Sequence, residues 1–207
     1  KVSTLQNHKV SINIINRIKR KFLETVKNNK IDLVIFSDFN YGFVTKGLID
    51  YISTISKKYN IKVIADCQTS SQYGNILKYN DINLITPTEQ ESRVSLHDYE
   101  CGLVELIHKM QKKSLYKNVF LKLGKDGFLI QNNDKNSLHT DKLGPINLNP
   151  KDASGAGDSL LTFSGLALAS NTSIWVAAYL GALAAAIQVS RIGNIPISKK
   201  EILMSLK

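Results

Sequence analysis

Cysteine, proline and tryptophan are scarce in this sequence of 207 residues, which has two cysteines, four prolines and one tryptophan. Cys67 and Cys101 lie far apart and show no Cys-x-x-Cys spacing. The sequence therefore predicts neither a disulfide framework nor a zinc site built on paired cysteines. The four histidines also show none of the spacings that metal ligands require.

A long apolar run is missing as well. The longest, from Ile174 to Val189, is shorter than the about 20 residues that a membrane span needs. No signal peptide is visible at the start of the sequence, so we expect a cytoplasmic protein with no membrane partner. The alanines and glycines of the run predict a tightly packed helix, with Trp175 and Tyr179 in the core rather than stacked on a base.

Acidic residues are outnumbered by basic ones, 17 against 27, which gives a formal net charge of +10. Such a charge is common in proteins that bind nucleic acids. However, the lysines are scattered in short groups such as residues 19–21, with no arginine-rich stripe or aromatic platform. A general compositional bias accounts for them, so we predict no nucleic-acid partner. A basic surface also suits a phosphorylated, anionic substrate.

Two apolar patterns alternate along the chain, continuous runs that indicate buried strands and helical spacing that indicates amphipathic helices. Strands are predicted at residues 31–38, 61–66, 82–86, 118–123 and 128–131, with further short strands within 137–148. Helices are predicted at residues 12–27, 45–59, around 73–79, from 87 onward, near 98–113, and at 156–170, 173–190 and 198–206.

This alternation predicts an α/β fold, with βαβ units, a mostly parallel central sheet and helices on both of its faces. No internal repeat or linker interrupts it, so residues 1–207 are expected to form a single domain. Ligands of such sheets bind at the carboxyl ends of the strands. Asp38, Asp66, Thr86, Gly124 and the segment 155–158 all follow predicted strand ends. We therefore expect one site along one edge of the sheet.

The segment Gly155-Ala156-Gly157-Asp158 has the pattern expected of an anion site. Small residues before a helix expose backbone N–H groups, and the helix adds its positive end, which suits a transferring phosphoryl group. A carboxylate at that position has a use if it accepts the proton of an attacking hydroxyl. The alternative is that Asp158 only caps the helix dipole. Spacing alone leaves both open.

Two other glycine motifs fail against the sequence. A Walker loop needs GxxxxGK[ST], which does not occur. A dinucleotide fingerprint needs GxGxxG or GxGxxA, and Leu160 stands in the third position of the only candidate. The glycines of this segment therefore do not predict either of these nucleotide-binding loops.

The run Asp152 to Asp158, DASGAGD, resembles the D-T-x-G-A-G-D signature of ribokinase-like, or PfkB, carbohydrate kinases. Other stretches follow in the family's order, and the nearest similarity is to heptose-phosphate 1-kinase-type members. VIFSDFNYG resembles the S-D-Y-x-x-G strand, and VIADCQ the strand that ends in D-P-K. TPTEQE resembles P-N-x-x-E, KLGKDG resembles T-x-G-x-x-G, and VSRIGN resembles the closing T-R-x-G-A.

The resemblance implies a role for each matching residue. Asp158 would be the catalytic base, and the amides of Gly155, Ala156 and Gly157 the anion hole. Glu91 would help to organise Mg²⁺ and phosphate through water. The resemblance implies two further sets: Lys122, Gly124 and Gly127 at the nucleotide, and Asp152 with carbonyls near Ser154, Val189 and Gly193 at a monovalent cation such as K⁺.

Simpler interpretations remain for two of these sets. Gly124 and Gly127 also fit an ordinary hairpin turn, and Glu91 also fits an acid in the first turn of a helix. Asp38 and Asp66 could equally be strand-end caps.

The sequence departs from the family in two places. Thr88 stands where the P-N-x-x-E segment has Asn, which puts the metal organisation in doubt. The first thirty residues also contain nothing like the family's N-terminal strands, Gly-Gly signature and lid. We therefore expect a ribokinase-like α/β/α fold without these parts, and an exposed hydrophobic sheet edge that needs a partner.

These observations predict an ATP-dependent kinase that phosphorylates a hydroxyl of a sugar or sugar phosphate, with Mg²⁺ and a monovalent cation. Its partners would be further copies of the chain or a second chain that supplies the missing region. The alternative is a non-catalytic nucleotide-binding or assembly subunit of the same fold.

Overall fold

The computed structural model describes residues 10–68, 74–134 and 137–206. A six-stranded sheet runs through the chain in the order β1-β2-β3-β4-β5-β6. The strands are β1 (Leu33–Asp38), β2 (Lys62–Cys67), β3 (Leu84–Ile85), β4 (Asn118–Lys122), β5 (Phe128–Asp134) and β6 (Ser137–Leu143). The first four are parallel, and the last two are antiparallel additions. The predicted mostly parallel sheet is confirmed.

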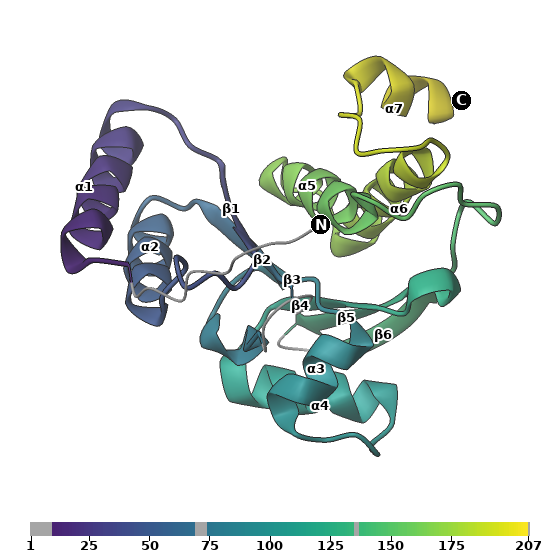
Figure 1. Ribbon diagram of the computed structural model, residues 1–207, viewed down its shortest axis with the longest axis horizontal. Coiled ribbons are helices and arrows are strands. Elements are labelled where there is room, and N and C mark those ends of the chain that lie inside the picture. The colour runs from purple at the N-terminus through teal and green to yellow at the C-terminus, as the bar shows by residue number, and fades with distance from the viewer. Residues whose placement is uncertain (1–9, 69–73, 135–136, 207) are drawn as a thin grey trace, which may run out of the picture.

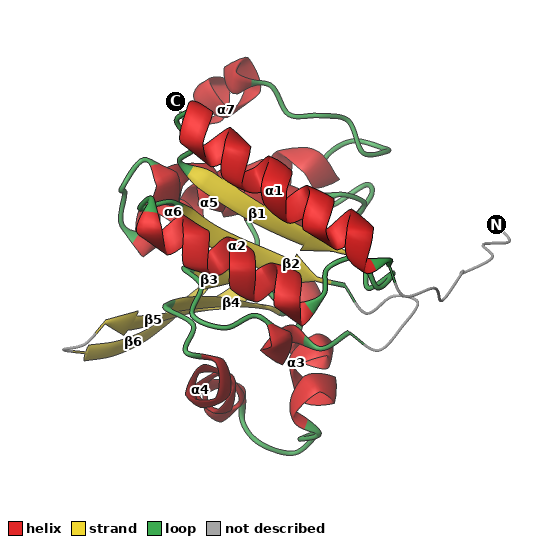
Figure 2. Cartoon of the chain, turned by 90° about the vertical axis from the view of Figure 1, so that its left-hand side faces the viewer, coloured by secondary structure: helices red, strands yellow, loops and turns green. Residues whose placement is uncertain are grey.

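Helices cover both faces of this sheet (Figure 1). They are α1 (Ile12–Asn28), α2 (Lys46–Lys58), α3 (Glu89–Leu96), α4 (Leu103–Ser114), α5 (Ala156–Ala169), α6 (Ile174–Val189) and α7 (Lys199–Ser205). Figure 2 shows α1 and α2 in front of β1 and β2, with α5 and α6 behind them. The three-layer α/β/α arrangement is therefore as predicted.

Two hydrophobic cores, one on each face, follow from the alternation of side chains along the strands. In β2, Val63 and Ala65 pack with α1, α2 and α4, whereas Ile64 packs with α5 and α6. Both faces are apolar, which is why the central strands appear as continuous apolar runs in the sequence.

Two predicted helices have different bounds. Helix α4 begins at Leu103 rather than near residue 98, because the Asp98 carboxylate accepts hydrogen bonds from the N–H groups of Glu100 and Cys101 and holds a turn there. Of the helix expected around residues 73–79, the described part is a single 3₁₀ turn, Ile76–Lys78. Tyr73 lies outside the described residues.

The prediction that Trp175 and Tyr179 pack in the core is wrong, since they are 37% and 45% exposed. Helix α6 packs on α5 through its small residues instead. A Cβ atom added at Gly181 would lie 2.1 Å from Ser164 Oγ and 2.8 Å from the Leu160 carbonyl oxygen. This close approach turns the aromatic side of α6 outward. Among the described residues, no helix is long and apolar enough to cross a membrane.

Strand β1 forms one edge of the sheet and, within the described ranges, pairs only with β2. Its Ile35 is 36% exposed. The segment after it carries the exposed rings of Phe39, Tyr41 and Phe43. This edge therefore has the apolar, unpaired character that the sequence predicts for it.

Candidate functional site

Helix α5 starts at the carboxyl edge of the sheet, and its first residues have a conformation that only glycine adopts easily. Gly155, the N-cap, has φ of 77°. A Cβ atom there would lie 2.3 Å from Oδ1 of Asn194. Both facts require a residue without a side chain at this position, and the segment that contains Asn194 is held directly against the start of the helix.

The open N–H groups at this helix start differ from the predicted set. The Ala156 N–H donates to the Ala153 carbonyl oxygen at 3.2 Å, and the first bond within the helix runs from Ser159 N to Gly155 O. Within the described part of the chain, the N–H groups of Gly155, Gly157 and Asp158 have no acceptor. The donors available to an anion are therefore those of Gly155, Gly157 and Asp158.

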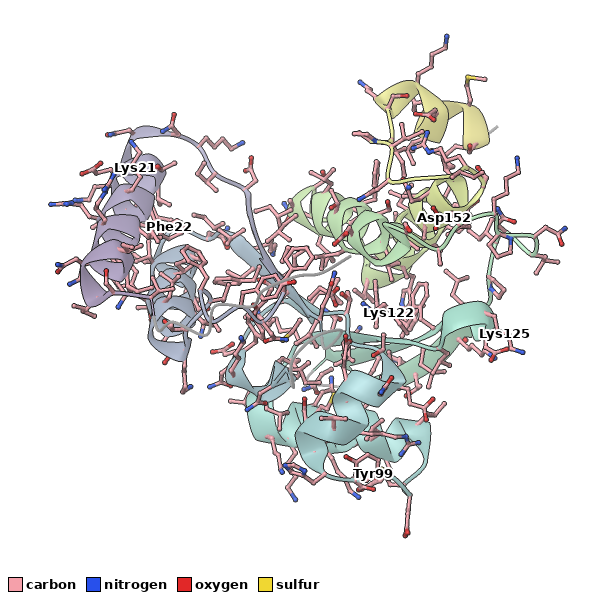
Figure 3. The ribbon with its side chains drawn as sticks, in the orientation of Figure 1. Lys21, Phe22, Tyr99, Lys122, Lys125 and Asp152 are labelled. Carbon is pink, nitrogen blue, oxygen red and sulfur yellow. The ribbon has the colours of Figure 1, made fainter. Side chains whose placement is uncertain are left out.

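Lys122 brings a positive charge to the same place (Figure 3). It ends β4, and its Nζ lies 2.9 Å from Oδ1 of Asp66, the penultimate residue of β2. The side chains of Lys122 and Asp66 are 17% and 4% exposed. A Cβ atom on Gly157 would lie 3.5 Å from Lys122 Nζ. An ammonium group, a helix N-terminus and open N–H groups therefore meet at one point, the arrangement that binds phosphate groups.

Asp158 lies in the first turn of α5 and is half-buried. Burial raises the pKa of its carboxyl group, nearby Asp66 raises that pKa further, and Lys122 lowers it. A carboxylate with a raised pKa is a stronger proton acceptor, as a general base requires. The same residue also has the position of a first-turn acid, so both sequence interpretations agree with its location.

The segment Gly124–Gly127 forms the turn between β4 and β5, closed by the Leu123 N–H on the Gly127 carbonyl oxygen at 2.8 Å. Gly127 has φ of 82°, and a Cβ atom there would lie 2.0 Å from the Leu143 carbonyl oxygen. The segment is thus the hairpin turn that the simpler interpretation predicts. A surface cavity of about 380 Å³ lies beside this turn, lined by Thr88, Glu89, Gln90, Arg93, Tyr99, Lys122, Leu123 and Gly124.

Glu91 is buried and completes a capping box with Thr88 at the start of α3. Its Oε2 accepts the Thr88 N–H at 2.7 Å, and its own N–H donates to Thr88 Oγ1 at 3.2 Å. The Lys122 N–H donates to the Pro87 carbonyl oxygen at 2.8 Å. These bonds hold the start of α3 next to the end of β4, so Glu91 and Lys122 belong to the same edge of the sheet.

Asp152, Ser154, Val189 and Gly193 also come together as predicted. Oδ1 of Asp152 accepts the N–H and the hydroxyl of Ser154, at 2.9 and 2.7 Å, and Oδ2 accepts the Gly193 N–H at 2.9 Å. The Val189 carbonyl oxygen accepts the Lys151 N–H at 2.7 Å. The hydrogen bonds of Asp152 to Ser154 and Gly193 lower the pKa of its carboxyl group.

The sequence interpretation missed Gln188 in this cluster. Its Nε2 donates to the carbonyl oxygens of Ser154 and Gly193, at 3.2 and 2.9 Å. It is the only side-chain amide in the apolar run from Ile174 to Val189. That isolation was the available signal, since a buried amide needs hydrogen-bond partners.

Comparison with known proteins gives the same picture of the chain. The profile described as "pfkB family carbohydrate kinase" matches residues 16–201. The bifunctional protein HldE of Sulfurimonas denitrificans is 27% identical over 195 residues, which cover 89% of this chain and 39% of that protein. HldE of Campylobacter jejuni is 28% identical over 191 residues, with shares of 90% and 39%.

Solved structures share the fold. The structure of Escherichia coli phosphofructokinase-2 in complex with potassium matches with a TM-score of 0.76 and 17% identity, over 94% of this chain and 62% of that one. The structure of Arabidopsis thaliana ribokinase complexed with ribose and ATP matches with a TM-score of 0.69 and 19% identity, over 96% and 60%. The chain thus spans under two-fifths of these two HldE proteins and under two-thirds of these two structures.

Proposed function

The chain belongs to the pfkB family of carbohydrate kinases, and on this basis we propose that it transfers the γ-phosphoryl group of ATP to a hydroxyl of a sugar or sugar phosphate. Residues 1–207 would act as one kinase domain. The match to the carbohydrate kinase profile supports a sugar or sugar phosphate as acceptor, and in this proposal the protein would act in the cytoplasm.

The single observation that carries this proposal is the meeting of Lys122, Gly157 and Asp158 at the start of α5. In the proposed reaction, the hydroxyl oxygen attacks the γ-phosphorus, and the bond from that phosphorus to the oxygen it shares with the β-phosphorus breaks. Asp158 accepts the hydroxyl proton. The open N–H groups and Lys122 Nζ stabilise the negative charge on the phosphoryl oxygens. ADP and the phosphorylated sugar leave.

Gly124 and Gly127 keep the backbone of the β4–β5 turn close to the nucleotide in this proposal, beside the cavity that Lys122 also lines. Glu91 lies at the same edge, where a carboxylate orients water around a phosphate-bound cation. The turn does not compete with the role of the glycines, because it fixes the backbone from which a ligand is contacted. The capping box holds the Glu91 carboxylate at this edge through Oε2.

Mg²⁺ fits these residues as a cation that is held mainly by phosphate and water. No group of three metal-ligating side chains lies together in the described residues. In the proposed reaction Mg²⁺ would arrive with ATP. Glu91, assisted by Thr88, would hold its water ligands. Bound Mg²⁺ would neutralise charge on the phosphates and orient them.

The residues predicted for a monovalent cation differ from the rest of the site, because their carbonyl oxygens already accept hydrogen bonds. The Val189 carbonyl oxygen accepts from the N–H groups of Lys151 and Asp152, so both of its lone pairs are used. That of Gly193 accepts from Gln188 and from the Ile195 N–H, and that of Ser154 accepts from Gln188. The residues as they stand therefore do not fit K⁺, and the proposed reaction contains no step through it.

Two further aspects are part of this proposal. The exposed edge of β1 would be covered in the working protein by another copy of the chain or by a partner chain.

The alternative to an enzyme is a non-catalytic nucleotide-binding or assembly subunit. The open β1 edge favours that alternative, whereas Asp158 with its raised pKa favours the enzyme.

Calorimetry with ADP and ATP in the presence of Mg²⁺ tests the proposal. We expect the chain to bind both, and Gly157→Val to weaken binding, because its side chain would enter the space between the helix start and Lys122. Gly102→Val is the matched control, since nothing lies within 4 Å of a Cβ atom there. Absence of nucleotide binding by a folded chain would refute both the kinase and the nucleotide-binding subunit. Binding without sugar phosphorylation by the longest available form of the protein would favour the subunit.

A further inference from the structure

Gln188 lies at the end of α6 and is only 1% exposed. A buried amide at this depth needs partners for its polar atoms. Its Nε2 donates to the carbonyl oxygens of Ser154 and Gly193, at 3.2 and 2.9 Å. The amide group has two N–H donors and therefore satisfies both carbonyl oxygens.

The two carbonyl groups belong to different segments that have to be held together. Ser154 immediately precedes the N-cap of α5, and Gly193 lies in the loop after α6. Asp152 joins the same segments a second time, because its carboxylate accepts from Ser154 and from Gly193. The loop in turn places Asn194 against Gly155. The position of the anion-binding N–H groups thus depends on this junction.

Carbonyl oxygens that converge without donors repel one another, and a monovalent cation is one solution because carbonyl oxygens replace its hydration shell. The junction between 152–154 and 189–193 is where such a cation is expected from the sequence resemblance. In this chain the partial positive charge of a side-chain amide meets the carbonyl oxygens of Ser154 and Gly193 instead.

We propose that the Gln188 amide takes the place of a monovalent cation at this junction, so that the anion site is assembled without K⁺. Gln188 is then a positioning residue, acting on the phosphate-binding N–H groups through Ser154 and Gly193. The inference rests on the proposed function only in assigning the α5 start to phosphate binding. The junction itself is a property of the fold.

The first test compares the wild-type chain in potassium chloride and in tetramethylammonium chloride at equal ionic strength. We expect the affinity for ADP with Mg²⁺, measured by calorimetry, to differ by less than about 2-fold, and the midpoint of thermal unfolding to be the same in both salts. A saturable increase of either quantity with K⁺ in the wild type would overturn the inference, whatever the variants do.

The second test removes the amide. In Gln188→Ala the carbonyl oxygens of Ser154 and Gly193 lose the donor that the amide supplies, and the shorter side chain leaves room for a cation. We expect ADP to bind about 10-fold more weakly in tetramethylammonium, as the loss of buried hydrogen bonds implies, and K⁺ to restore both affinity and unfolding temperature. Gln188→Ser, which also shortens the side chain and leaves room for a cation, is the second variant should Gln188→Ala not fold. Indifference of both folded variants to K⁺ would also overturn the inference.

Gln111→Ala is the matched control, because Gln111 is also a buried amide that donates to a backbone carbonyl, that of Tyr116. It lies on α4, which packs on the other face of the sheet from α5 and α6. We expect this variant to lose stability equally in both salts. If wild-type chain binds no nucleotide in either salt, the proposed function fails, and the unfolding temperatures still decide the inference.

Discussion

Two neighbouring strands end in the same way and then differ. β1 ends in Asp38 and β2 carries Asp66 next to its end, and each of these residues is 3% exposed and paired with a lysine. Asp38 pairs with Lys78 and also accepts from the Tyr79 hydroxyl at 2.8 Å. Asp66 pairs with Lys122.

The difference lies in what the lysines do with their remaining donors. Lys78 Nζ also donates to Asn40 Oδ1 at 3.4 Å and to the Val44 carbonyl oxygen at 3.2 Å, so its three donors are used within the protein. Lys122 Nζ has Asp66 as its one side-chain acceptor among the described residues, and it lies beside Gly157. The Lys78–Asp38 pair, the closed pair, therefore supports the fold. The Lys122–Asp66 pair, the open pair, faces the start of α5, where a phosphate would bind. A buried ion pair by itself therefore does not mark a site.

The largest expected effect is at the start of α5, next to the open pair. In a form of the protein that phosphorylates a sugar, Asp158→Asn should lower kcat by about 10²–10⁴, because the amide keeps the geometry but accepts no proton. Steady-state kinetics of sugar-dependent ADP release measures this, with Asp32→Asn, an exposed acid directly before β1, as the control. If Asp158 only caps the helix, kcat should stay nearly constant and stability should fall by about 0.3–1 kcal/mol.

The same carboxyl group sets the direction of a pH effect. A protonated Asp158 accepts no proton, so kcat should fall as the pH drops through its pKa. Burial and Asp66 raise that pKa above 3.8, which places the acid limb above that of an ordinary aspartate. Lys122 lowers the pKa, so Lys122→Met should move the limb to higher pH. If the acid limb of the pH profile does not move in Lys122→Met, Lys122 does not influence the pKa of Asp158.

The closed pair should show the largest loss of stability. Lys78→Met leaves Asp38 buried without its cation, which costs about 3–5 kcal/mol. Urea unfolding measures the change. Lys57→Met is the control, because the Lys57–Asp81 pair is exposed and pairs of that kind contribute at most about 1 kcal/mol. Equal losses in the two variants would mean that burial does not distinguish these pairs.

Lys122→Met should change the preference between nucleotides. If Lys122 contacts the γ-phosphate, removing one charged hydrogen bond should weaken ATP binding by about 10-fold or more and ADP binding by much less. Calorimetry with Mg²⁺ gives both constants, and Lys58→Met, exposed in the last turn of α2, controls for loss of charge. Equal weakening of both nucleotides would show that Lys122 acts only through Asp66.

The last prediction concerns Cys67, whose Sγ lies 3.9 Å from Oδ2 of Asp38 in the closed pair. Burial raises the pKa of its thiol to about 12 from 9.0, so its thiolate fraction at pH 8 is about 10³-fold below that of an ordinary thiol. In Cys101→Ser, where Cys67 is the only thiol, a disulfide reagent should therefore react only when the chain unfolds. Rapid labelling of the folded protein would mean that the structure around Cys67 opens without global unfolding.

The sequence by itself determined the elements and their order. Strand runs that are apolar on both faces, glycines before Asp158 and caps such as Thr88 with Glu91 are local signals, because they depend on the next few residues. The alternation of strands and helices placed Asp66, Gly124 and the start of α5 at one edge of one sheet.

Tertiary structure decided which donors and acceptors meet. The pairing of Lys122 with Asp66 joins residues 56 positions apart, and Gln188 meets Ser154 across 34 positions. Helix α6 is apolar on all sides, so no periodicity indicated that Trp175 faces outward; the close packing at Gly181 decided it. The hydrogen bond from the Ala156 N–H to the Ala153 carbonyl oxygen likewise depends on the conformation of the turn before α5. Contacts of this kind depend on side-chain reach in three dimensions, and one sequence carries no record of that.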